Sequence, residues 1–114
     1  PHVIPFCYVF DGESIYSGLD GKPKTTPLRQ LRRVRNILEN PHVSVVIDHY
    51  EEDWSRLHFV LISGEARLLE TGDEWLSAIV LLRDKYPQYQ HMDLDESPVI
   101  KINPITYFPW SSHP

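Results

Sequence analysis

Cysteine, methionine and glycine are scarce in this sequence, and long apolar runs are missing. One cysteine, one methionine and five glycines occur among the 114 residues. Because a lone cysteine has no partner within the chain, an internal disulfide is excluded, and the apolar run around Cys7 predicts a buried, inert thiol. No apolar stretch approaches the roughly 20 residues that cross a bilayer, so we expect a soluble, cytoplasmic protein without membrane contact.

Positive charge is also in short supply, except in one segment. The net charge of -5 argues against a general nucleic-acid binder, because such proteins carry an overall or domain-wide positive balance. No acid occurs between residues 21 and 38, and six of the eleven basic residues lie there: Lys22, Lys24, Arg29, Arg32, Arg33 and Arg35. The segment is a concentrated cationic patch, but the acidic remainder would repel a polyanion, so no nucleic-acid partner is expected.

Patterns of metal ligands and catalytic nucleophiles are lacking too. The six histidines show no ligand spacing, and we expect no metal site. Cys7 has no neighbouring base in the sequence, and no serine stands in the turn context that activates a nucleophile.

What the chain does have is regular β and α periodicity, in a length suited to a single domain over residues 1–114. The Asp-Gly pair at 11–12 predicts a hairpin of two strands over 3–10 and 14–19. Strands are also expected over 43–48, 57–70 and 98–103, with Gly64 as a bulge. The tail over 104–114 is expected to be extended and ordered only by docking its aromatic side chains.

Two helices are expected between these strands. Helical spacing of apolar residues predicts the first from Pro27 to about Asn40. A capping box formed by Thr71 and Glu74 predicts the start of the second, which ends before Pro87. Strands linked by hairpins, with two helices among them, indicate an α+β fold with antiparallel pairing.

The strongest signal for ligand binding is a turn within residues 16–26. Lys22 and Lys24 come just before Thr25 and Thr26, which stand where the first helix begins. Lysine charge, hydroxyl groups and the free N–H groups of a helix start all suit a phosphate. A solvated basic turn with an ordinary N-cap is the alternative interpretation.

Several sequence runs are together similar to one family. They are Pro-His-Val-Ile-Pro-Phe at 1–6, Tyr-Ser at 16–17, Lys-Pro-Lys at 22–24, Leu-Arg-Arg-Val-Arg-Asn at 31–36 and Asp-His-Tyr-Glu-Glu-Asp-Trp-Ser-Arg-Leu at 48–57. Gly-Glu-Ala-Arg at 64–67 and Tyr-Pro-Gln-Tyr at 86–89 add to them. Over nearly its whole length the chain resembles the deazaflavin-dependent branch of the pyridoxamine-phosphate-oxidase-like family.

The resemblance implies a fold, a cofactor and a partner. The fold is an antiparallel six-stranded split β-barrel of the FMN-binding type with two helices. The partner is a second copy of the chain, and the resulting homodimer holds FMN or the deazaflavin coenzyme F-420 at each subunit interface. Relatives carry a helix and a first strand ahead of the Pro-His run, so both elements are expected to be missing from this chain.

Residue by residue, the resemblance also implies a cofactor-binding set. Val3, Ile4 and Pro5 match a strand whose backbone runs along the ring system, and Lys24 with Thr25 matches the phosphate turn. His58 and Phe59 stand where oxidase relatives place an arginine and a glutamine, and Phe59 cannot make that glutamine's polar contact. The full set is Val3, Ile4, Pro5, Tyr16, Ser17, Lys22, Lys24, Thr25, Arg29, His58, Phe59 and Trp110.

Two functions from different classes follow. One is an oxidoreductase that moves a hydride or electrons between the bound ring and a small substrate, with no catalytic residue assigned because the cofactor carries the chemistry. The other is a non-catalytic protein that carries a flavin, a deazaflavin or haem in the same groove. Trp54 and Trp110 could each cover a flavin ring, and packing in the core or at a dimer interface explains either tryptophan equally well.

Overall fold

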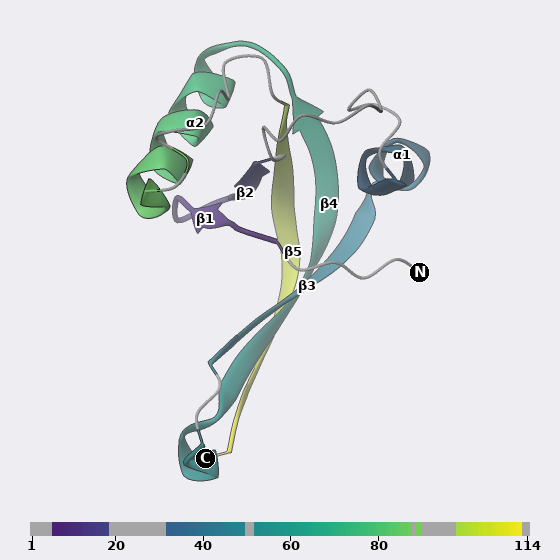
Figure 1. Cartoon of the computed structure of the whole chain (residues 1–114). Helices are drawn as coiled ribbons and strands as arrows, with labels where there is room; N and C mark the ends of the chain where they lie inside the picture. The colour runs from purple at the N-terminus through teal and green to yellow at the C-terminus, as the bar shows by residue number, and fades with distance from the viewer. Residues whose placement is uncertain (1–5, 19–31, 50–51, 88, 90–97, 113–114) are drawn as a thin grey trace.

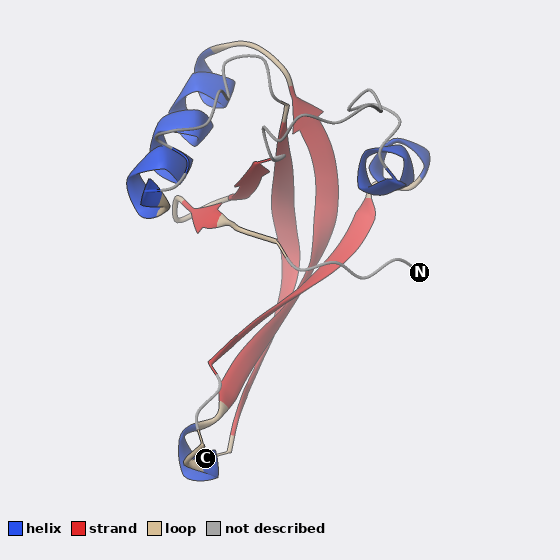
Figure 2. Cartoon of the chain, in the orientation of Figure 1, coloured by secondary structure: helices blue, strands red, loops and turns tan. Residues whose placement is uncertain are grey.

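The computed structural model describes residues 6–18, 32–49, 52–87, 89 and 98–112. Within these ranges the chain forms an α+β fold whose elements are β1 (Val9–Phe10), β2 (Ile15–Gly18), α1 (Arg32–Glu39), β3 (His42–His49), the short 3-10 helix η2 (Trp54–Arg56), β4 (His58–Leu69), α2 (Asp73–Lys85) and β5 (Val99–Ser111). All neighbouring strands pair antiparallel in one sheet of order β1-β2-β5-β4-β3. The sheet curls into a half-barrel with α1 and α2 on opposite sides (Figures 1 and 2).

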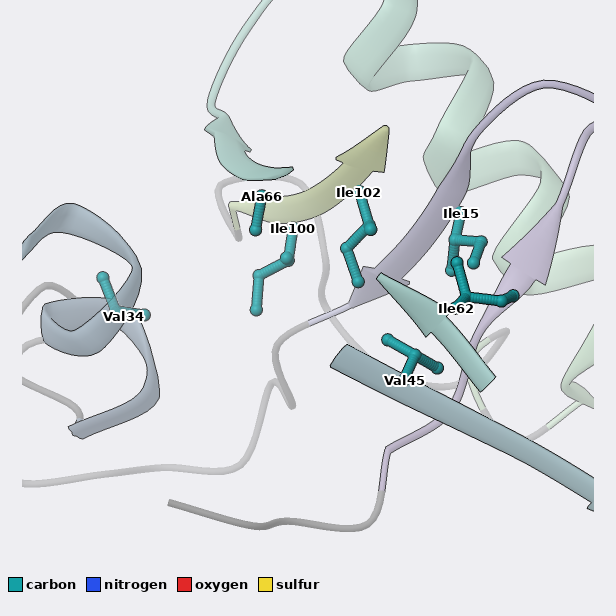
Figure 3. Close-up of a cluster of buried hydrophobic side chains, with 7 residues drawn as sticks. All are labelled: Ile15, Val34, Val45, Ile62, Ala66, Ile100 and Ile102. Atoms are coloured by element: carbon teal, nitrogen blue, oxygen red, sulfur yellow. The ribbon is translucent and has the colours of Figure 1, made fainter. Parts of the chain in front are cut away.

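Alternation along the strands divides the apolar residues between two cores. On β5, Ile100 and Ile102 face the α1 side, whereas Val99 and Lys101 face α2, as the two-residue period of a strand requires. The core on the α1 side contains Ile15, Val34, Val45, Ile62, Ala66, Ile100 and Ile102 (Figure 3). Val34 is the only residue of this group that comes from a helix, so it is the one fully buried side chain through which α1 packs on this core.

The second core lies under α2. Trp75, Ala78, Ile79 and Leu82 are the buried residues of this helix, and their spacing gives it a single apolar face. They pack on Tyr16 and Val99 of the sheet and on Tyr89. The helix predicted after residue 71 and its end before Pro87 are therefore confirmed.

The predicted capping box is wrong. Gly72 is the N-cap of α2, at φ 102°, and no side chain caps the helix. The carboxylate of Glu74 instead takes hydrogen bonds from Tyr16 and ion pairs from Lys101 and Arg67. Three donors, two of them cationic, bind this carboxylate in place of the one backbone N–H of a capping box, and the opposite charges add Coulomb attraction to the hydrogen bonds.

The described chain has five strands rather than six. The strand expected over 3–10 is paired only at Val9 and Phe10, and residues 1–5 lie outside the described part. Tyr8 is bound instead by the end of α2. Its N–H donates to the Tyr86 hydroxyl at 3.0 Å, and its carbonyl accepts from Tyr86 at 2.9 Å and from Lys85 Nζ at 2.8 Å. These side chains satisfy the backbone groups that a neighbouring strand would have taken.

Cys7 is exposed, so the buried thiol expected from its apolar surroundings is wrong. Its neighbours Phe6 and Tyr8 are both partly buried and pack on the α1-side core. The intervening side chain points away from that core, as alternation along an extended segment requires.

The tail is extended as predicted as far as Ser111, but strand pairing orders it in place of docked aromatic side chains alone, because β5 continues eight residues past the expected end. Residues up to Ile102 pair with β2, and the whole of β5 pairs with β4. Beyond Ile102, the edge of β5 that faces away from β4 has no partner strand within the described chain. Proline is tolerated at such an edge, so Pro104 and Pro109 can stand in β5 although they have no backbone N–H. A register shift at Ser63 and Gly64 confirms the predicted bulge.

Past this bulge, β3, β4 and β5 continue as a twisted three-stranded ribbon that projects from the body and ends at η2 (Figures 1 and 2). We call this ribbon the arm, comprising residues 44–49, 54–63 and 105–111. Neither α1 nor α2 covers the arm (Figure 1). Among the described helices, none has the length and hydrophobicity needed to cross a bilayer.

Candidate cofactor groove on the arm

An open groove of about 760 Å³ lies on the arm. Its lining comes from all three strands: Ile47, Asp48, His58, Phe59, Val60, Pro109, Trp110 and Ser111. Ile47 and Val60 also pack against the α1-side core. The groove is therefore adjacent to the α1-side core along β3 and β4. Most of its lining is apolar.

An aromatic pair forms part of the lining. Phe59 and Trp110 are register partners on β4 and β5, with ring centroids 5.3 Å apart and planes inclined by 18°. Cross-strand aromatic pairs stabilise a sheet, and their faces offer a flat surface on which another planar ring can stack. Two residues of the predicted cofactor set are therefore in direct contact.

A second ring pair joins the preceding residue of β4 to the strand on its other side, β3. His49 on β3 is the register partner of His58 on β4, and their imidazoles stack with centroids 4.9 Å apart at an angle of 11°. Nδ1 of His58 lies 3.4 Å from the carbonyl oxygen of Arg56. Since neighbouring residues of a strand point to opposite faces, the histidine pair and the Phe59–Trp110 pair flank the ribbon from its two sides.

The groove has little charge. Asp48 is the only acid among the lining residues, and these described residues include no lysine or arginine. The groove therefore suits a planar, largely apolar group, and a phosphate bound there would need cations from another segment.

Tyr16, by contrast, lies on the α2 side and is 4% exposed. Its hydroxyl donates to Glu74 at 2.8 Å and to Asp11 at 3.3 Å. Burial first, and then the hydrogen bond to Glu74, raise the pKa of Tyr16 above its ordinary value. The hydroxyl is therefore held as a neutral donor between two carboxylates rather than free to face a ligand.

This contact belongs to a row across the sheet. Tyr16, Lys101 and Arg67 are register neighbours on β2, β5 and β4, and all three bind the Glu74 carboxylate. The bond from Lys101 is the largest cause, followed by the bond from Tyr16, of the lowered pKa of Glu74. Backbone bonds from Ser14 in the same way contribute most to the lowered pKa of Asp11. The row fixes α2 to the sheet.

The predicted cofactor set is thus divided. His58, Phe59 and Trp110 all line the arm groove, with Phe59 and Trp110 in direct contact, while Tyr16 lies under α2. Ser17 is buried and pairs with Ile100, so its side chain faces the α1 side. Val3, Ile4, Pro5, Lys22, Lys24, Thr25 and Arg29 lie outside the described residues.

The sequence did not reveal the rest of the groove. Ile47, Asp48, Val60, Pro109 and Ser111 join it through strand register alone. The short separation of the segments around residues 48 and 58 is the one sequence feature from which their pairing as a hairpin could have been predicted. Trp54, considered for covering the ring, is 71% exposed in η2 and does not line the groove.

Comparison with known proteins settles the family. Residues 1–106 match the family described as pyridoxamine 5'-phosphate oxidase. The chain belongs to this family. No match was found among proteins of curated function.

Solved structures share this family's fold. A candidate pyridoxamine 5'-phosphate oxidase from Listeria innocua is 23% identical, with a TM-score of 0.62, over 91% of this chain and 73% of its own. A conserved hypothetical protein from Mycobacterium tuberculosis is 20% identical, with a TM-score of 0.72, over 98% and 69%. HutZ, the haem storage protein from Vibrio cholerae, is 14% identical, with a TM-score of 0.66, over 90% and 72%. At these identities the likeness concerns the fold.

The ring of Phe59 stacks on Trp110, so this part of the groove is lined by apolar aromatic surface. A planar group bound there would meet dispersion contacts.

Proposed function

We propose that this chain binds FMN or the deazaflavin coenzyme F-420 along the arm groove and works as an oxidoreductase on a small substrate. The observation that carries the proposal is the Phe59–Trp110 stack within an apolar groove, in a chain that belongs to the pyridoxamine 5'-phosphate oxidase family. A flat aromatic surface beside apolar walls fits a planar tricyclic ring better than it fits a charged or flexible ligand.

The phosphate of the cofactor needs a separate anchor. The described lining of the groove supplies no cation, and its one acid, Asp48, would repel a phosphate. Lys24 and Thr25, with Lys22 and Arg29 nearby in sequence, offer the charge and hydroxyl that the groove lacks. We therefore assign the ring to the arm and the phosphate to the Lys22–Lys24 turn.

Bound flavin or deazaflavin supplies the hydride or electron transfer itself. The residues of the chain then have two tasks. Phe59 and Trp110 hold the ring plane, and Asp48, on the same face of the ribbon, attracts a neutral or cationic substrate in preference to an anion.

We also propose that two copies of the chain associate through the arm. Val46, Ile105, Phe108, Tyr107 and Trp110 are large apolar side chains that the arm leaves exposed. Register places Val46 and Phe108 with Leu61 on one face, whereas Tyr107 lies on the other face, where its partner Ile62 is already buried in the α1-side core. Exposed apolar side chains gathered on one face in this way mark a surface that a partner covers. Because the groove opens on the same ribbon, a second copy would complete its walls.

The test is the absorption spectrum of the purified full chain, with mass spectrometry of any small molecule released on denaturation. We expect flavin-type absorption and a mass of FMN or F-420, or, for protein without a cofactor, saturable binding of one of the two in a titration. Binding of neither compound, by protein that is folded and dimeric, would overturn the proposal. Riboflavin serves as the control, since it keeps the ring and lacks the phosphate.

A second candidate is a non-catalytic carrier of haem. It is favoured by the exposed imidazoles of His49 and His58 beside an apolar groove, because histidine is a common axial ligand of haem iron. The haem storage protein HutZ has the same fold. Haem titration followed by its Soret absorption separates the candidates. A 1:1 haem complex, together with no binding of FMN or F-420, would replace the oxidoreductase proposal with the carrier.

A further inference from the structure

The two stacked histidines of the arm are neighbouring potential metal ligands, although their spacing in the sequence does not indicate it. His49 and His58 are nine positions apart, a separation that matches no common metal-ligand motif. The antiparallel register of β3 and β4 makes them direct neighbours, and both side chains are exposed. Direct cross-strand partners have Cβ atoms about 4.5–5.5 Å apart, so two imidazoles there reach the same point in solvent.

One ring nitrogen of the pair is already oriented by the backbone. When Nδ1 of His58 carries the proton, it donates to the Arg56 carbonyl oxygen, which lies 3.4 Å away. That tautomer leaves Nε2 unprotonated, with its lone pair available. A histidine that ligates a metal commonly donates its other N–H to a backbone carbonyl in this way, and the bond fixes both ring orientation and tautomer.

The charge around the pair favours a cation. Asp48 precedes His49 and lines the groove together with His58. Asp53 caps η2 by accepting hydrogen bonds from the N–H and hydroxyl of Ser55, and the hydroxyl bond is the main reason that its pKa is lowered. Glu52, next to it, is exposed. Among the described residues at the tip of the arm, these three carboxylates outnumber one cationic side chain, that of Arg56, so the formal charge there is net negative.

We propose that His49 and His58 together bind one divalent transition-metal ion, of the Zn²⁺ or Cu²⁺ class, with water completing its coordination. The described residues contain no group of three or more metal-ligating side chains, so the protein supplies two ligands here. Imidazole nitrogen suits Zn²⁺ and Cu²⁺ and disfavours Ca²⁺ and Mg²⁺, which prefer oxygen. The site borders the arm groove through His58, and its test requires no cofactor, so it can fail or succeed independently of the function proposed above.

Binding requires a small movement of the rings. A metal ion lies in the plane of each imidazole that binds it, at about 2.0–2.1 Å from the nitrogen for Zn²⁺. The rings are now nearly parallel, so each must turn about its side-chain bonds until the two planes converge on one point. Both rings are exposed and project beside each other from paired strands.

The experiment is a titration of the untagged full chain with Zn²⁺ against a chromophoric chelator, repeated for His49→Asn, His58→Asn and His42→Asn. His42 is the matched control, because it is also an exposed histidine of β3 but pairs with Glu65. We expect one ion per chain and a loss of affinity of roughly 10²-fold in either pair variant, since the second ligand then no longer acts intramolecularly. His42→Asn should bind like the wild type.

Electron paramagnetic resonance of the Cu²⁺ complex provides a readout on the wild type itself, independent of how the variants fold. We expect hyperfine structure from two imidazole nitrogens in the wild type and in His42→Asn. Circular dichroism checks that each variant keeps its secondary structure. Wild-type affinity in a folded His58→Asn chain, loss of the site in His42→Asn, or a copper spectrum without nitrogen hyperfine structure would each overturn the proposal.

Discussion

Gly64 on β4 lies so close to Asn103 on β5 that a Cβ atom at Gly64 would stand 2.3 Å from the Asn103 carbonyl oxygen. The same atom would lie 3.0 Å from the Asn103 carbonyl carbon and 3.1 Å from Cα of Pro104. All three neighbours are backbone atoms of the paired strand, so none can move aside by a rotamer change. The position coincides with the bulge at which the body of the sheet passes into the arm.

Gly64→Ala should therefore destabilise the fold. Overpacking of a filled site costs about 1–3 kcal/mol, and rigid backbone neighbours place this substitution at the upper end of that range or beyond. The measurement is the free energy of unfolding from urea denaturation. Ser63→Ala, one residue earlier on the same strand, is the control and should change stability by less than about 1 kcal/mol. Equal stability of the two variants would show that the strands separate more easily here than their contact indicates.

Sequence patterns predicted the local structure best where packing and periodicity agree. The strand around 57–70 and the helix after residue 71 were found because Ile62 and Ala66 alternate, and Ile79 and Leu82 repeat, at the period of their elements. The strand over 104–111 was missed because Pro104 and Pro109 argue against pairing. Only the open outer edge of β5 makes those prolines acceptable, and the position of an edge is a property of the whole sheet.

The site was predicted to a smaller extent, for a related reason. The family resemblance pointed to His58, Phe59 and Trp110, which the structure brings together. Neither the resemblance nor local periodicity showed that His49 stacks on His58, because this contact follows from strand register. Register is fixed by the pattern of buried residues on two strands at once, which a reading of one segment at a time does not include.

Tyr16→Phe should remove a contribution to the free energy of unfolding that is present at neutral pH and is lost at alkaline pH. The folded state holds the phenolic proton more tightly than the unfolded state, because the pKa of Tyr16 is raised. Its contribution to stability is therefore complete below the ordinary pKa of about 10 and is lost as pH rises toward the folded-state value. We expect the wild type to be more stable than the variant at pH 7 to 9, with the difference shrinking above pH 10. Urea denaturation across this range is the measurement, and a constant difference would contradict the mechanism.

Phe108→Glu should dissociate the proposed homodimer. Phe108 is 60% exposed on the arm, and burying such a side chain contributes about 1.5–3 kcal/mol, counted twice at a symmetric interface. We expect the dimer dissociation constant to rise by at least roughly 10²-fold. Leu76→Glu is the matched control, since Leu76 is 54% exposed on the outer face of α2 and lies away from the arm. Light scattering over a concentration series measures both, and a dimer lost only in Leu76→Glu would move the interface to α2.

Lys24→Ala should weaken binding of the phosphorylated cofactor by roughly 1.5–3 kcal/mol, the range for a hydrogen bond to a charged group. Lys22→Ala should weaken it less. Titrations with FMN and F-420 give both values, and riboflavin should lose no affinity in either variant because it has no phosphate. If wild type and Lys24→Ala bind FMN equally well, the phosphate lies elsewhere in the protein.

Any catalysis should depend on how the cofactor is positioned and not on one proton donor of the chain. Tyr16 is buried under α2 with its hydroxyl engaged by Glu74, and His49 and His58 stack on each other at the edge of the groove. General acid-base catalysis contributes typically 10²–10⁴-fold, so removal of a dedicated donor would cost at least that much.

We therefore expect His49→Ala, His58→Ala and Tyr16→Phe each to lower turnover by less than roughly 10²-fold at saturating cofactor. The assay follows reduction of a tetrazolium or quinone acceptor by pre-reduced cofactor, at saturating and at limiting cofactor for each variant. Lys24→Ala is the comparison, and it should lose at least as much rate as these variants when cofactor is limiting, because it acts on binding. A loss above roughly 10³-fold at saturating cofactor in any of the three would identify a dedicated proton donor, since positioning alone leaves the donor's contribution intact.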